Sequence, residues 1–148
     1  MKHFIFDLDG TLIDTEWPIL LTWQKTLNDY GYSFSLEKVA IVLGVPTQAG
    51  LEKLGVAVDQ NFNKRWFDHY AAFAPEAVFF PGAEEILTAL KEKGAVLGAV
   101  SSRCRKEYQD YFSKFQLQRF FDVVILEEDT AEHKPHPAPL LKYLEITG

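Results

Sequence analysis

The segment DLDGTL at residues 7–12 places two carboxylates, Asp7 and Asp9, one residue apart and directly after a short apolar run, HFIF. An apolar run of this length, followed by a Gly-Thr loop, predicts a buried β-strand that ends at the acids. Ligands of parallel α/β sheets bind at the carboxyl ends of the strands, so we expect both side chains in that crevice. Two carboxylates so placed can divide the work between a nucleophile and a general acid and base. The alternative is an acidic turn without chemistry, because Asp and Gly are ordinary turn residues.

The composition indicates a globular protein and limits its partners. Of the 148 residues 47% are hydrophobic, which is typical of a chain with a packed core. The net charge of -6 argues against nucleic acids and anionic membranes as partners, so an anionic ligand needs a local positive patch. The single cysteine suits a reducing compartment. Because the sequence carries neither a membrane-spanning apolar stretch nor a signal-peptide pattern, we expect a soluble cytoplasmic protein.

The chain contains an all-helical range and a range in which helices alternate with strands. Between residues 15 and 77 apolar residues recur at helical spacing, and polar caps and glycines divide the range into helices without a strand. Later in the chain, helices alternate with apolar strands near 95–100 and 122–126, which predicts βαβ units and a parallel sheet buried on both faces. The fold class is therefore α/β, with a discontinuous core of residues 1–14 and 78–148 and an inserted all-helical domain of residues 15–77.

Polar residues follow three successive strands of the predicted sheet. Asp7 and Asp9 follow the first strand, Ser101 and Ser102 follow the second, and Lys134 lies in the loop beyond the third. In a right-handed parallel arrangement these loops emerge at one edge of the sheet. A nucleophile, a second acid, hydroxyl donors and one ammonium suit a phosphoryl group, whose transfer needs positioning and charge stabilisation. Taken singly, the serines could cap the next helix and the lysine could be a solvated side chain.

This arrangement predicts a role for each side chain. Asp7 attacks phosphorus to form an aspartyl phosphate, and Asp9 protonates the leaving oxygen and later activates water. Ser101 donates a hydrogen bond to a phosphoryl oxygen, and Lys134 holds nucleophile and phosphate together as a point charge. A hard divalent cation, Mg²⁺, is expected on the carboxylate of Asp7 and the backbone carbonyl of Asp9.

Three motifs in this order resemble the signatures of the haloacid dehalogenase superfamily. FIFDLDGTLID at 4–14 resembles the first signature, GAVSS at 98–102 the second and KPHP at 134–137 the third. FPG at 80–82 is similar to the point where the chain re-enters the core in members with a helical cap. The resemblance implies a Rossmann-like core, a mobile helical cap and Mg²⁺-dependent phosphoryl transfer on a small phosphorylated metabolite. The cap pattern is similar to that of the phosphoglycolate phosphatase and β-phosphoglucomutase branch.

Individual positions within this resemblance narrow the expected reaction. By the resemblance, Gly10, Thr11 and Ser102 lie at the phosphate. A second acid two positions after the first favours phosphate chemistry over dehalogenation. Ile19 stands where β-phosphoglucomutases carry a histidine of the cap, which disfavours a phosphomutase. The segment GVPT at 44–47 stands where related enzymes place a substrate-contacting loop, and a plain interhelix turn is the alternative.

The fourth signature of the family, a pair of acids after a further strand, has no counterpart between the last predicted helix and Gly148. The acidic stretch at 127–129 precedes Lys134 and is expected to be a solvated loop. Three explanations of the missing fourth signature remain open. The chain is a truncated product, the missing strands come from a second chain, or the site has lost its metal-binding acids. The first explanation fits the family pattern best. An exposed first strand would favour a homo-oligomer or strand-swapped dimer. Two function classes follow, a Mg²⁺-dependent phosphatase and a non-catalytic phosphate-binding or interaction module.

Overall fold

The computed structural model describes every residue except 44 and 46, and the chain divides into two compact units. Met1–Asp14 and Phe79–Gly148 form the first, which we call the core unit. Thr15–Val78 forms the second, which we call the helical unit. That the helical unit acts as a cap over a substrate stays a prediction.

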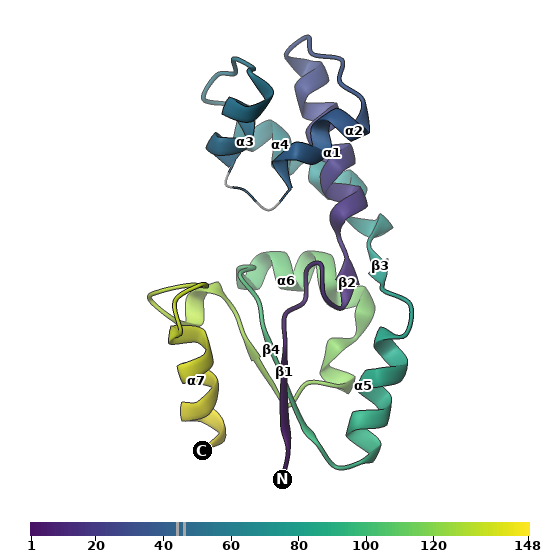
Figure 1. Cartoon of the computed structure of the whole chain (residues 1–148), viewed down its shortest axis with the longest axis vertical. Coiled ribbons are helices and arrows are strands. Elements are labelled where there is room, and N and C mark those ends of the chain that lie inside the picture. The colour runs from purple at the N-terminus through teal and green to yellow at the C-terminus, as the bar shows by residue number, and fades with distance from the viewer. Residues whose placement is uncertain (44, 46) are drawn as a thin grey trace. The chain divides into compact units, whose positions relative to one another are not determined.

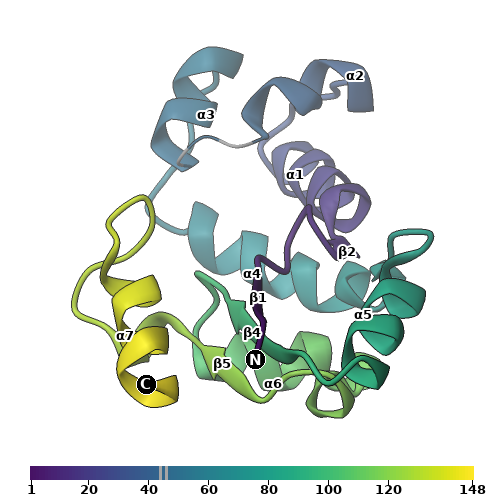
Figure 2. The ribbon, with the colours of Figure 1, turned by 60° about the horizontal axis from the view of Figure 1, so that its bottom comes forward.

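The core unit contains a three-stranded parallel sheet in the order β1-β4-β5, whose strands are labelled in Figures 1 and 2. The central strand is buried from Leu97 onward, as the uniformly apolar sequence predicts. The first strand lies at an edge, where Phe4 and Ile5 remain 36% and 37% exposed. The prediction of a buried first strand was therefore wrong, because among the described residues this strand has a neighbour on one side only. The strands of this sheet are β1 (His3–Phe6), β4 (Val96–Val100) and β5 (Val123–Ile125).

Three α-helices accompany the sheet, and Figures 1 and 2 show α5 and α7 on opposite sides of the β1–β4 pair. Helix α7 packs on β4 and β5 through Tyr143, which is fully buried and contacts Val100. The hydroxyl of Tyr143 lies 2.9 Å from Nδ1 of His3, within hydrogen-bond distance. A Cβ atom on Gly98 would lie 2.2 Å from the Tyr143 ring, so β4 needs glycine at this position. These helices are α5 (Ala83–Glu92), α6 (Arg105–Phe112) and α7 (Ala138–Thr147).

A small two-stranded sheet of β2 (Ile13–Asp14) and β3 (Val78–Phe79) forms where the chain leaves and re-enters the core unit. Beside it, the backbone N–H of Phe80 donates to the carbonyl of Leu12 at 2.9 Å. Strands of two residues carry no periodicity, and the sequence therefore does not predict them.

The helical unit has a core of its own, to which all four of its α-helices contribute. Leu27 is fully buried, and the rings of Trp23 and Phe62 lie 5.4 Å apart in the same cluster. Ser35 caps α2 as its sequence predicts, because its Oγ accepts from the N–H of Lys38. The possible substrate-contacting loop at 44–47 falls partly outside the described residues. The α-helices are α1 (Glu16–Asp29), α2 (Leu36–Val39), α3 (Thr47–Leu54) and α4 (Phe62–Phe73).

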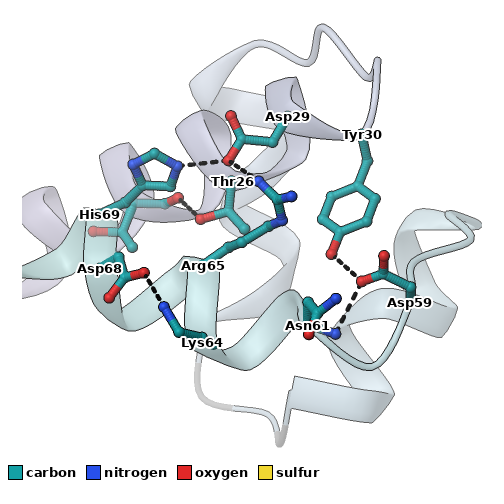
Figure 3. A network of polar contacts seen from close by, with 10 residues as sticks. Thr26, Asp29, Tyr30, Asp59, Asn61, Lys64, Arg65, Asp68 and His69 are labelled. Carbon is teal, nitrogen blue, oxygen red and sulfur yellow. Dashed lines mark hydrogen bonds and ion pairs between the residues drawn. The ribbon is translucent and has the colours of Figure 1, made fainter.

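Polar side chains join the end of α1 to α4 and the loop before it, as Figure 3 shows. Oδ2 of Asp29 lies 2.7 Å from Nε2 of His69 and 3.8 Å from Nη1 of Arg65. The hydrogen bond from His69, helped by the charges of His69 and Arg65, lowers the pKa of Asp29. The hydroxyl of Tyr30 donates to Oδ1 of Asp59, and this bond lowers the pKa of Asp59. We call this set of contacts the α1–α4 clasp.

Short 3₁₀-helices extend or replace several helix ends and loops. None of the helices in the described part of the chain is both long enough and apolar enough to cross a membrane. The 3₁₀-helices are η1 (Ala40–Val42), η2 (Ala74–Glu76), η3 (Ser113–Phe115), η4 (Leu117–Arg119) and η5 (Glu127–Asp129).

Candidate active site

The two acids after β1 lie in a tight turn. The backbone N–H groups of residues 11–13 all donate to the carbonyl of Leu8, at 3.0–3.2 Å. Gly10 has a φ of +76°, in the left-handed region that glycine adopts without steric cost. The positive φ at residue 10 explains why the turn needs a glycine at this position. The turn leaves Asp7 exposed and Asp9 half-buried. The expected phosphate contacts of Gly10 and Thr11 stay predictions, although both residues are exposed at this turn.

Lys134 joins the loop before α7 to the ends of two strands. Its Nζ donates to Oδ1 of Asp7 at 2.8 Å and to the carbonyl of Val100 at 2.9 Å. Oδ1 of Asp7 also accepts from the N–H of Leu8 at 2.9 Å. The side chains of Lys134 and Asp7 are 36% and 46% exposed, so a ligand can reach the pair. The structure thus brings together two of the predicted site residues, and Lys134 is not merely solvated.

Ser101 follows β4 and is buried, whereas Ser102 is exposed. The N–H of Ser101 donates to the carbonyl of Ile125, and its Oγ accepts from the N–H of Arg103 at 3.1 Å. A hydroxyl that accepts can still donate its proton, as the predicted phosphate contact of Ser101 requires. The serines do not cap α6, because Cys104 occupies the N-cap position and its Sγ accepts from the N–H of Glu107.

Cys104 has no sign of an activated thiol. The N–H of Glu107 lowers its pKa, but burial and the neighbouring carboxylate of Glu107 outweigh this bond, and the pKa of Cys104 is raised overall. A raised pKa disfavours the reactive thiolate at neutral pH.

Arg103 is a site residue that sequence reasoning missed. Its Nη2 and Nε lie 2.8 and 3.1 Å from the two carboxylate oxygens of Asp9, and its Nη1 lies 3.0 Å from Oε2 of Glu107. Only 12% of the Arg103 side chain is exposed. Its place two residues after Ser101, at the edge of the sheet that carries the acids, was the signal available in the sequence.

The residues present match part of a magnesium site. The carboxylate of Asp7 and the backbone carbonyl of Asp9 are oxygen ligands, the type that Mg²⁺ prefers. The described residues contain one grouping of three potential metal ligands within 4.8 Å, namely Cys104, Glu107 and Glu127, and neither aspartate belongs to it. The carboxylate of Asp7 and the carbonyl of Asp9 would therefore supply two oxygen ligands to Mg²⁺, and among the described residues no third acid joins them.

The acidic stretch at 127–129 is exposed at Glu127 and Glu128, as expected of a solvated segment, but it forms a 3₁₀-helix and not a plain loop. Both carboxylate oxygens of Glu128 accept from the N–H of Arg105, at 2.8 and 3.0 Å. Asp129 pairs with the guanidinium of Arg105 and accepts from the N–H of Leu126. These contacts fix the stretch as η5, so two of its three acids serve local structure.

The comparison with known families identifies the class of protein. The model of the family described as "Haloacid dehalogenase-like hydrolase" matches residues 4–148. The chain therefore belongs to the haloacid dehalogenase-like hydrolases, as its three motifs predict, and the predicted α/β core with an inserted helical segment is the fold of its structural neighbours.

Curated relatives carry phosphatase names. The chain is 32% identical to the phosphoglycolate phosphatase of Aquifex aeolicus, over all of this chain and 71% of that protein. It is 31% identical to the pyrophosphatase PpaX of Bacillus cereus, over 96% of this chain and 67% of that protein. It is 28% identical to the phosphorylated carbohydrates phosphatase of Thermotoga maritima, over 98% of this chain and 70% of that protein. The chain spans about two thirds of the length of the curated relatives it matches.

Solved structures agree with this assignment. A structure described as that of a candidate β-phosphoglucomutase from Thermotoga maritima has a TM-score of 0.81 and 26% identity, and the match covers all of this chain and 72% of that one. A subfamily IA hydrolase of the superfamily from Geobacter sulfurreducens has a TM-score of 0.78 at 24% identity, and the match covers 99% of this chain and 72% of that one. These structures share the fold of this chain. The enzyme class predicted from the sequence, a hydrolase of this superfamily, is confirmed by the family match and by the phosphatase names of the curated relatives.

Proposed function

We propose that this chain is a Mg²⁺-dependent phosphatase that hydrolyses a small phosphate monoester through an aspartyl phosphate on Asp7. The contact of Lys134 with both Asp7 and the carbonyl of Val100 carries the proposal. It puts a carboxylate nucleophile, an ammonium and the end of β4 at one accessible place. Phosphoryl transfer needs this combination, because its transition state carries charge on several oxygens and little covalent help is required.

In the first step, a carboxylate oxygen of Asp7 attacks phosphorus while the bond from phosphorus to the leaving oxygen breaks. Oδ1 of Asp7 is held by Lys134 and by the N–H of Leu8, which orients Oδ2 as the attacking atom. Protonated Asp9 gives its proton to the leaving oxygen, which departs as an alcohol. Lys134 and the hydroxyl of Ser101 stabilise charge on the phosphoryl oxygens.

In the second step, water attacks the phosphorus of the aspartyl phosphate, and the bond from phosphorus to Asp7 breaks. The carboxylate of Asp9 accepts a proton from the attacking water, which restores its protonated form. Asp7 returns as a carboxylate, and inorganic phosphate leaves. Mg²⁺ on the Asp7 carboxylate and the Asp9 carbonyl supplies further charge neutralisation for the phosphoryl group when it is bound.

The names of the relatives direct the search for a substrate. They are a phosphoglycolate phosphatase, pyrophosphatases and a phosphatase of phosphorylated carbohydrates, all of which act on small anions. The chain itself has a net charge of -6, so attraction of such an anion depends on a local cation, the exposed ammonium of Lys134. We infer a small phosphorylated metabolite as the substrate. A phosphomutase is disfavoured because Ile19 cannot transfer a proton.

A non-catalytic phosphate-binding module on the same fold is the second candidate. The observation in its favour is that, among the described residues, no third acid joins Asp7 and Asp9 to complete a metal site. Such a module binds phosphate without turning over an ester.

The edge of β1 is the surface at which we expect copies of the chain to pair. Phe4 and Ile5 expose apolar side chains beside the backbone of an edge strand, an arrangement that favours strand pairing between molecules. Sedimentation velocity measures this association. A chain that stays monomeric at high concentration contradicts it.

The rate of phosphate release separates the two functions. We expect Mg²⁺-dependent release from p-nitrophenyl phosphate, phosphoglycolate, pyrophosphate or a sugar phosphate, and a loss of about 10⁴-fold or more in Asp7→Asn. Lys142→Met, which removes a lysine of α7 paired with Glu145, is the matched control and should keep full activity. Equal rates for wild type and Asp7→Asn at saturating Mg²⁺ would exclude the phosphatase, and retained phosphate binding in that case would favour the module.

A further inference from the structure

The guanidinium of Arg103 approaches Asp9 edge-on, with one nitrogen on each carboxylate oxygen. The two distances are 2.8 Å from Nη2 to Oδ1 and 3.1 Å from Nε to Oδ2. Two parallel bonds from a planar guanidinium fix both the position and the plane of a carboxylate, which a single bond does not. Each carboxylate oxygen has two lone pairs, so these bonds leave an acceptor site on each oxygen for a proton.

Arg103 is itself held from several sides. Its third nitrogen, Nη1, pairs with Glu107 of α6 at 3.0 Å, and its guanidinium carbon lies 5.3 Å from the centre of the Phe112 ring. Its N–H donates to Oγ of Ser101, and its carbonyl accepts from the N–H of Glu127 at 2.9 Å. A side chain this buried and this constrained gives its partner a fixed orientation at small entropic cost.

We propose that Arg103 is a positioning residue that fixes the carboxyl group of Asp9 for proton transfer to the leaving oxygen. The inference rests on the proposed function, because it assigns Asp9 the role of general acid. Arg103 acts through Asp9 and is not required to touch the substrate. Loss of this orientation therefore slows the proton transfer and leaves the attack by Asp7 intact.

Substrates that differ in their leaving group report on this role. A p-nitrophenolate ion departs without a proton, whereas the alkoxide of an alkyl phosphate needs one as the bond breaks. A misplaced general acid therefore lowers kcat/KM for an alkyl phosphate far more than for p-nitrophenyl phosphate. A residue that only binds phosphate, or only supports the fold, lowers both values by the same factor.

The experiment compares kcat/KM of the full chain on p-nitrophenyl phosphate and on an alkyl phosphate that wild type accepts, both with Mg²⁺. We expect Arg103→Met to lower the alkyl value by about 10²-fold and the aryl value by less than about tenfold, because general acids contribute roughly 10²–10⁴-fold. Lys106→Met is the control, since it removes an exposed cation of α6, the helix that follows Arg103, and this cation pairs with Asp110. It should change neither value.

Two further variants keep the test decisive. In an Asp9→Asn background, Arg103→Met should not change the ratio of kcat/KM on the alkyl phosphate to kcat/KM on p-nitrophenyl phosphate any further, because the two residues act as one unit. Arg103→Lys keeps a cation but not the two-point contact, so it should give a smaller selective loss and serves if Arg103→Met does not fold.

The outcomes distinguish the two claims. An equal loss on both substrates, or an Arg103 variant as active as wild type, overturns the positioning role and leaves the phosphatase in place. A wild-type chain without Asp7-dependent turnover overturns the proposed function, and this inference fails with it.

Discussion

Removal of the ammonium of Lys134 should change kcat much more than it changes the free energy of unfolding. Lys134→Met deletes Nζ and keeps most of the aliphatic stem. In the structure Nζ makes two contacts, at 2.8 Å to Asp7 and 2.9 Å to the carbonyl of Val100. The side chains of the ion pair are 36% and 46% exposed. Solvent screens a pair of this exposure, so it contributes no more than about 1 kcal/mol to folding.

The effect on catalysis is expected to be larger. As Asp7 attacks, negative charge collects on the phosphoryl oxygens beside Nζ, and loss of one such donor costs about 10²–10³-fold in kcat, or roughly 2.7–4 kcal/mol. We therefore expect kcat of Lys134→Met to fall by about 10²-fold or more while the free energy of unfolding changes by at most about 1 kcal/mol. Phosphate release and urea denaturation measure the two quantities on the same protein. A folded Lys134→Met variant that keeps more than a third of the wild-type kcat would refute this reasoning.

Two predictions concern stability. Gly98→Ala forces a Cβ to within 2.2 Å of the Tyr143 ring and should lower the free energy of unfolding by about 1–3 kcal/mol, measured by urea denaturation. An unchanged free energy of unfolding, or no recovery when Tyr143 is also changed to Leu, contradicts this packing. Asp29→Asn breaks the pair with His69 in the α1–α4 clasp and should cost up to about 1 kcal/mol at pH 6. Because the pKa of Asp29 is lowered in the fold, its contribution is present above its unfolded pKa of about 4 and is lost as pH falls through the folded value. The difference between wild type and Asp29→Asn should therefore shrink in acid, and a difference that grows as pH falls would contradict the clasp.

The sequence predicted the order of helices and strands because their periodicities differ. The uniformly apolar run near 95–100 became the central strand β4, and the helical spacing before residue 74 became α1 to α4. Helix ends were less predictable, since several last turns tighten into 3₁₀-helices, such as η3 after α6. The apolar run before Asp7 alone predicts a buried strand, because an apolar strand looks the same in a sequence whether one or both of its edges are paired. The lack of a further predicted strand after the last helix was the signal that β1 would be an apolar edge strand, as the structure has it.

The candidate site was predictable where polar residues follow strands, and less so where side chains reach across loops. The position of Lys134 beyond the third strand indicated a place near Asp7, and the structure puts the two side chains 2.8 Å apart. The bond of Arg103 to Asp9 joins residues 94 positions apart and depends on the direction that a long side chain takes. No local pattern in the sequence encodes that direction.

Direct detection of the covalent intermediate tests the central claim. The chain is mixed with Mg²⁺ and an aryl phosphate, quenched in acid within the first turnovers, digested and analysed by mass spectrometry. We expect a peptide that contains Asp7 to gain the mass of one phosphoryl group, more strongly in Asp9→Asn, where the water that releases the phosphate is not activated. The gain should be absent in Asp7→Asn. Phosphate release by wild type with no modification at Asp7, or with modification at another residue, would contradict the account.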